Sequence, residues 1–125
     1  MSGSISVTLP SRRYSTVARL VCGGLASRLA LPYAAVDDLQ QAIEIVLRSA
    51  TVPRELTVVD FATDEASLTV AISPVAAGAL DARVGREDDA PPLRQLLLRL
   101  VDDVSVETEP RLRIVLRRLC PPMER

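Results

Sequence analysis

Two hydrophobic periods alternate along this 125-residue chain, and their order restricts the folds that are open to it. Apolar side chains recur every second residue over 5–9, 68–73, 104–107 and 112–116, as in strands with one buried face, and 56–62 is a further extended run. They recur every three to four residues over 17–29, 33–50 and 93–101, as in amphipathic helices. The resulting order β-α-α-β-β-loop-α-β-β predicts an α/β (α+β) two-layer sandwich. Its sheet is expected to be mixed, mainly antiparallel and five-stranded, with three helices on one face.

The helical stretches also predict which side chains are buried. The first helix is expected to bury Val17, Leu20, Val21, Leu25 and Leu29. Its Gly23–Gly24 pair lowers helix propensity and predicts a kink or close packing. The second helix is expected to bury Val36, Leu39, Ile43, Val46 and Ala50.

Residues 74–90 have no period and are predicted to form a long loop, of the kind that is usually a functional lid or disordered. No linker or repeat is visible, so residues 1–125 are expected to form one domain.

Composition excludes most familiar catalytic chemistry. The chain has no His, Lys or Asn, so it has no Ser-His-Asp triad, no phosphate-loop lysine and no Schiff base. Its two cysteines, Cys22 and Cys120, are too few for a zinc site or a disulfide framework and are expected to be core thiols. We therefore expect neither a catalytic residue nor a metal ligand.

Charge and hydropathy indicate the compartment. The net charge is −1 and aromatic residues make up 2% of the chain, so we interpret the cluster of Arg111, Arg113, Arg117 and Arg118 as a solvated strand face. A nucleic-acid interface would need a basic chain with aromatic side chains for stacking. The uncharged stretch 66–80 is shorter than a membrane span, and no secretory signal is visible. These features predict a cytoplasmic protein with no nucleic-acid or membrane partner.

Three stretches together resemble the anti-sigma factor serine kinases, which have the ATP-binding fold of histidine kinases and gyrase. They are Val-Ala-Arg-Leu at 17–20, Asp-Leu-Gln-Gln-Ala-Ile at 38–43 and Leu-Val-Asp-Asp-Val-Ser-Val-Glu at 100–107. Their order and spacing cover nearly the whole chain. The resemblance implies binding to a sigma factor or to its small antagonist protein, with Arg19 as the contact residue of the first helix. The alternative for Arg19 is an ordinary solvent-exposed arginine.

The ATP motifs of that family are where this chain departs from it. The Glu and the Mg-binding Asn of the family's second helix correspond here to Ile45 and Ser49, and a register shifted by one residue would put Glu44 at the position of the Glu. Ile45 lies opposite the apolar stripe of its helix, which suits either the wall of a former ligand pocket or a single exposed or loop-covered isoleucine. The family's adenine-binding Asp-x-Gly-x-Gly corresponds to residues 74–78, where Pro74 replaces the Asp, Ala76 replaces the first Gly and Gly78 remains.

The glycine-rich entry to the third helix is lost as well. It corresponds here to Pro91 and Pro92, which have no N–H groups to donate to a phosphate. Glu87, Asp88 and Asp89 precede it and would repel a triphosphate. We therefore expect this chain to bind neither ATP nor Mg.

The resemblance and these losses together suggest a regulatory protein-interaction module that binds a sigma factor or its antagonist and uses no cofactor. A homodimer is compatible with this role. One alternative is an active ATP-dependent anti-sigma factor serine/threonine kinase that uses ATP and Mg. Another is a pocket rebuilt for a different, more apolar small ligand, with Ile45, Val75 and Ala76 in its wall.

Overall fold

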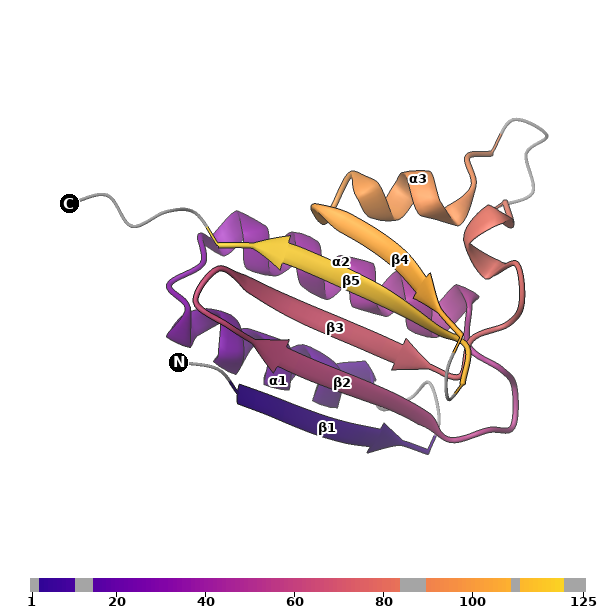
Figure 1. The fold of residues 1–125 in the computed structure, drawn as a ribbon, viewed down its shortest axis with the longest axis horizontal. Helices are drawn as coiled ribbons and strands as arrows, with labels where there is room; N and C mark the ends of the chain where they lie inside the picture. The colour runs from indigo at the N-terminus through magenta and orange to yellow at the C-terminus, as the bar shows by residue number, and fades with distance from the viewer. Residues whose placement is uncertain (1–2, 11–14, 84–89, 109–110, 121–125) are drawn as a thin grey trace.

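The computed structural model describes residues 3–10, 15–83, 90–108 and 111–120 (Figure 1). The strands are β1 (Gly3–Leu9), β2 (Thr57–Thr63), β3 (Ser67–Ser73), β4 (Asp103–Glu107) and β5 (Arg113–Leu119). The helices are α1 (Ser15–Arg28), α2 (Tyr33–Ser49) and α3 (Leu93–Leu98), with a short 3₁₀ helix, η2 (Ala79–Asp81), before α3. The predicted two-layer α+β sandwich with three helices and a five-stranded sheet is confirmed.

The sheet has the order β1-β2-β3-β5-β4, and all four pairings are antiparallel. The sequence predicted a mixed sheet, and that detail is wrong. The chain does cross from β3 through α3 to β4, which leaves these two strands running in the same direction. However, β5 lies between them and pairs with both, so no parallel pair forms.

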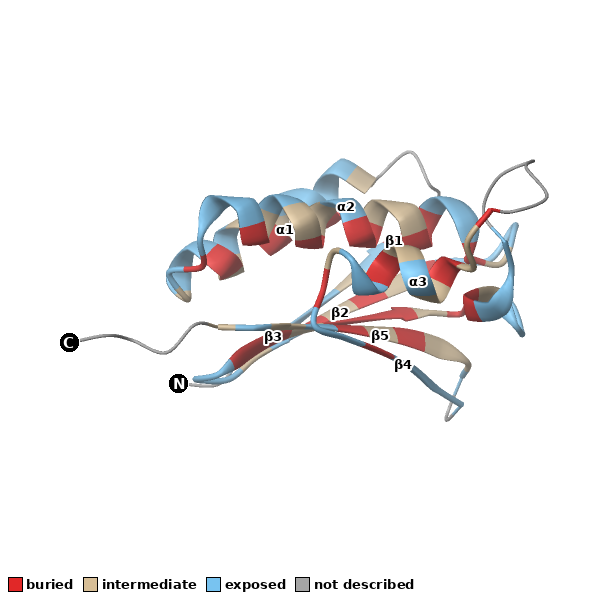
Figure 2. Ribbon diagram, turned by 90° about the horizontal axis from the view of Figure 1, so that it is seen from above, coloured by how far each residue is buried: buried red, intermediate tan, exposed pale blue. Residues whose placement is uncertain are grey.

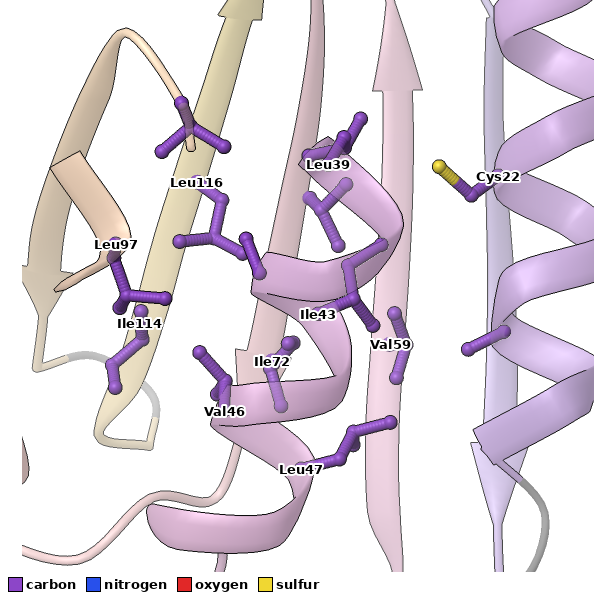
Figure 3. Packing of buried hydrophobic residues seen from close by; sticks show 14 of the residues in the cluster. Cys22, Leu39, Ile43, Val46, Leu47, Val59, Ile72, Leu97, Ile114 and Leu116 are labelled. Atoms are coloured by element: carbon purple, nitrogen blue, oxygen red, sulfur yellow. The ribbon is translucent and has the colours of Figure 1, made fainter. Parts of the chain in front are cut away.

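The core lies between the sheet and the helix layer (Figure 2). Strand alternation turns Val59, Phe61, Val70, Ile72, Ile114 and Leu116 toward the helices, and all six are fully buried. From α2, the predicted residues Leu39, Ile43, Val46 and Ala50 are fully buried and Val36 is half-buried. Figure 3 shows several of the α2 side chains lying over β2, β3 and β5.

The buried face of helix α1 is shifted from the predicted one: Val21, Leu25 and Leu29 are half-buried against the core as expected, whereas Val17 and Leu20 are exposed. Its buried residues are Ala18, Cys22 and Ala26, whereas Leu20 is 72% exposed. Three small residues spaced four apart let this helix lie close to its neighbours, and the larger side chains are left at its flanks or in solvent. The helix continues through Gly23 and Gly24. A Cβ atom at position 23 would lie 3.4 Å from Gln40 Nε2, which indicates close packing against α2.

The region predicted as a loop, 74–90, is only partly irregular. Thr51 forms a bridge with Val75, Arg83 forms one with Pro92, and η2 lies between them. Residues 84–89, which include Glu87, Asp88 and Asp89, lie outside the described residues. The predicted third helix reached residue 101 but α3 ends at Leu98. The N–H groups of Arg99 and Leu100 donate three residues back in a tighter turn, and the Asp102 N–H then donates to the Arg117 carbonyl beside β4.

Candidate functional site

The C-terminal end of α2 and the segment after β3 are joined through their backbones. The Ala76 N–H donates to the Ala50 carbonyl at 2.8 Å, and the Val75 N–H donates to the Leu112 carbonyl at 3.0 Å. Pro74 and Val75 are buried, whereas Ala76 is exposed. The segment that corresponds to the adenine-binding motif of the resembled family is thus packed between α2 and the start of β5, with two of its amide donors already used.

Ile45 and Ser49 lie one turn apart on the same flank of α2. At about 100° per residue, this flank faces away from Gln40 and Glu44, which contact α1. Ile45 is half-buried and packs against the core, which excludes the simple exposed isoleucine, whereas Ser49 is exposed. An aliphatic side chain therefore occupies the position where the resembled family has a carboxylate.

Gly78 starts η2 with a φ of 74°, in the left-handed region. No heavy atom lies within 4 Å of where its Cβ would stand. The backbone conformation at this turn therefore favours glycine, and a close approach to a ligand is not needed to explain it.

The start of α3 is covered by the chain that precedes it. Pro91 and Pro92 are half-buried, and the first helical N–H, that of Leu93, donates to the Ala82 carbonyl at 2.9 Å. The two prolines and this bond remove three backbone donors from the place where the resembled family holds phosphate.

A cleft of about 260 Å³ lies between η2, α3 and the ends of β4 and β5, with Ala76, Gly78 and Arg94 in its lining. Ile45, Ser49, Pro91 and Pro92 are not among its lining residues. Of the predicted nucleotide-site positions, the cleft thus contains only Ala76 and Gly78. Ligand pockets usually have about 300–1,000 Å³, so this cleft is small for a nucleotide.

Neither cysteine resembles an activated nucleophile. Cys22 is fully buried, and burial raises the pKa of its thiol to about 11. Cys120 is half-buried, and desolvation, followed by the charge of Asp64, raises the pKa of its thiol too. Both thiols are therefore protonated near neutral pH.

Arg19 stands on the flank of α1 that faces α2. Its side chain is 47% exposed, and its Nη1 lies 3.9 Å from Glu44 Oε2. The carbonyl of Arg19 accepts a hydrogen bond from Gln40 Nε2 at 3.0 Å. A long, exposed ion pair of this kind contributes little to stability, so the guanidinium is free to exchange Glu44 for another carboxylate.

Two large apolar side chains lie in solvent, one next to Arg19 in the chain and one at the start of α2. Leu20 is 72% exposed and Tyr33 is 90% exposed. Between the two helices runs a groove of about 470 Å³, which we call the α1–α2 groove. It is lined by Gly23, Ser27, Leu31, Tyr33, Val36, Asp37 and Gln40.

The sequence missed the exposure of Leu20, because this residue matched the apolar period and was assigned to the core. Tyr33 offered a signal that was not used. It is an aromatic residue in the first turn of a helix, three positions before the apolar stripe begins at Val36.

Comparison with known proteins leaves the function open. The sequence matches no protein-family model, and it matches no curated protein. Among the described residues, no helix combines the length and the apolar character that crossing a membrane requires. Within that part of the chain, no group of three or more His, Cys, Asp and Glu side chains could hold a metal ion.

Proposed function

We propose that this protein is a cytoplasmic regulatory module that binds a protein partner and does not use ATP. The observation that carries the proposal is the α1–α2 groove, which has the 90% exposed Tyr33 in its lining, together with the exposed Leu20 three residues before its lining residue Gly23. Single exposed apolar residues are common, but two large ones on neighbouring helices with a groove between those helices are typical of an interaction surface. Arg19 adds a cation at the edge of the groove, and arginine is frequently an interface anchor.

The chemistry of the surface describes the partner. It would place an apolar side chain against Leu20 and Tyr33 and a carboxylate against Arg19. A sigma factor or its small antagonist protein is the partner class that the resemblance to the anti-sigma factors suggests. Gly24 is exposed and has no heavy atom within 4 Å of the place of a Cβ, which leaves room for a partner to approach α1 at this residue.

Several observations favour a protein without nucleotide chemistry. The amides of Val75, Ala76 and Leu93 are already hydrogen-bonded within the protein. Ile45 places an aliphatic side chain where the resembled family has a carboxylate. An active serine/threonine kinase would need another way to hold both Mg and the triphosphate.

Binding is tested by titrating the sigma factors and antagonist proteins of the source organism, each purified, against the wild-type protein and its variants by calorimetry. Arg19→Glu should weaken binding roughly thirtyfold or more, which corresponds to about 2 kcal/mol for an interface anchor. Arg99→Glu reverses a charge on another exposed arginine, beyond the end of α3, and should bind like the wild type. Ser49→Ala, at the former Mg position, should also bind normally.

Two results would overturn the proposal. One is unchanged binding by Arg19→Glu, and the other is loss of binding by Ser49→Ala alone. A separate thermal-shift measurement tests the nucleotide-free state. Saturation with ATP-Mg at 100 times its dissociation constant would add about 2.7 kcal/mol of stability, and we expect no shift.

A further inference from the structure

The α1–α2 groove combines a carboxylate with an aromatic ring. The part of its lining that the structure describes holds one acidic side chain, that of Asp37, and no basic one. Its α2 wall consists of residues spaced three or four apart, which therefore share one face of the helix: Tyr33, Val36, Asp37 and Gln40. The groove is thus a site of negative charge with apolar surroundings.

The charge of Asp37 is not compensated by a neighbouring arginine. Its Oδ2 accepts a hydrogen bond at 3.0 Å from the side-chain amide of Gln41, which is neutral. The ion pairs among the described residues do not involve Asp37, and Arg19 is paired with Glu44. A cation that entered the groove would therefore meet a carboxylate that no described arginine already occupies.

The other lining residues suit a cation on an apolar stem. The ring of Tyr33 is open to solvent, and an aromatic face attracts a cation placed over it. The side-chain amide nitrogen of Gln40 donates to the Arg19 carbonyl, so its amide oxygen is left to accept. Leu31 and Val36 add apolar surface of the kind along which the methylene groups of a basic side chain pack.

We propose that the α1–α2 groove binds an arginine side chain of the protein partner. A guanidinium is planar, stacks on an aromatic ring and carries five N–H donors for the carboxylate and amide oxygens around it. Gly23 leaves the facing wall without a side chain, which gives this planar group room. The inference rests on the proposed function, because it needs a protein partner, and it adds a basic residue to the chemistry of that partner.

An arginine analogue tests the groove without the partner. N-acetyl-arginine amide, titrated into the whole chain and followed by two-dimensional NMR, should shift the backbone amide signals of Gly23, Ser27 and Gln40. A dissociation constant of roughly 1 mM is expected for so small a ligand. N-acetyl-citrulline amide has nearly the same shape without the charge and should leave these signals in place. Failure of this probe would be distinct from failure of the proposed function, which is tested separately with Arg19→Glu and purified partners.

Four substitutions assign the binding to named groups. Asp37→Asn should weaken binding of the arginine amide about threefold, and Tyr33→Leu should weaken it about two- to fivefold. Tyr33→Phe retains the ring and should bind like the wild type. Asp38→Asn removes an equal charge from the next position of α2, which does not line the groove, and should also bind normally.

Three results would overturn the proposal. One is equal binding of the citrulline and arginine amides. Another is unchanged binding by Asp37→Asn while circular dichroism shows a folded protein. The third is a shift of the same amide signals when the protein alone is diluted, because a second copy of the chain would then occupy the groove.

Discussion

Replacing Gly24 with alanine should stabilise the protein by about 1 kcal/mol, the difference between the two residues inside a helix. Gly24 lies within α1, is exposed, and has no heavy atom within 4 Å of the place where a Cβ would stand. The substitution therefore restricts the unfolded chain without creating a clash in the folded one. For a domain of this size, the melting temperature should rise by roughly 3–5 °C.

Gly23 provides the matched control one residue earlier. Alanine at position 23 has the same helix propensity, but its Cβ would stand 3.4 Å from Gln40 Nε2. That amide donates to the Arg19 carbonyl at 3.0 Å, and a hydrogen bond of this kind contributes about 1 kcal/mol. Moving the amide would offset the gain in propensity, so Gly23→Ala should be nearly neutral.

Urea unfolding followed by circular dichroism measures both variants. Equal stabilisation by the two alanines would show that α1 and α2 do not approach closely at Gly23. Destabilisation by Gly24→Ala would contradict the exposed, open environment of that position and would refute the packing described for α1.

Three further substitutions test other parts of the structure. Burial raises the pKa of the Cys22 thiol to about 11, so this thiol stabilises the fold fully below pH 9. The contribution is lost as the pH rises through 11. The stability difference between the wild type and Cys22→Ala should therefore fall by about 2–3 kcal/mol across that range, and a constant difference in urea melts would count against burial. Gly78→Ala should cost about 1–2 kcal/mol, because φ at this position is 74° and alanine disfavours that region; a neutral result by calorimetry would contradict the turn. Asp64 accepts the backbone N–H groups of Ala66 and Ser67, which lowers the pKa of its carboxyl. The contribution of this carboxylate to the free energy of unfolding should be present above pH 3.8 and lost as the pH falls below that value. Acid should therefore shift the midpoint of urea unfolding more for the wild type than for Asp64→Asn.

The candidate sites were only partly predictable. The order of elements placed Arg19 on the first helix, and the structure confirms that its side chain is partly exposed. The replacements at Ile45, Pro74, Pro91 and Pro92 were visible in the sequence, because they are changes of residue type. Whether these positions share one cavity was not visible, since the lining of a cleft depends on how segments far apart in the chain pack.

The sequence by itself determined the order of the helices and strands and the buried face of α2. Both follow from a local period, which each element expresses whatever surrounds it. The tertiary structure alone decided that β5 lies between β3 and β4, and that α1 buries alanines and a cysteine while Leu20 stays in solvent. Burial in α1 depends on how closely two layers approach, and small side chains allow the closest approach. A hydrophobic period records which residues favour burial, whereas packing distance decides which of them become buried.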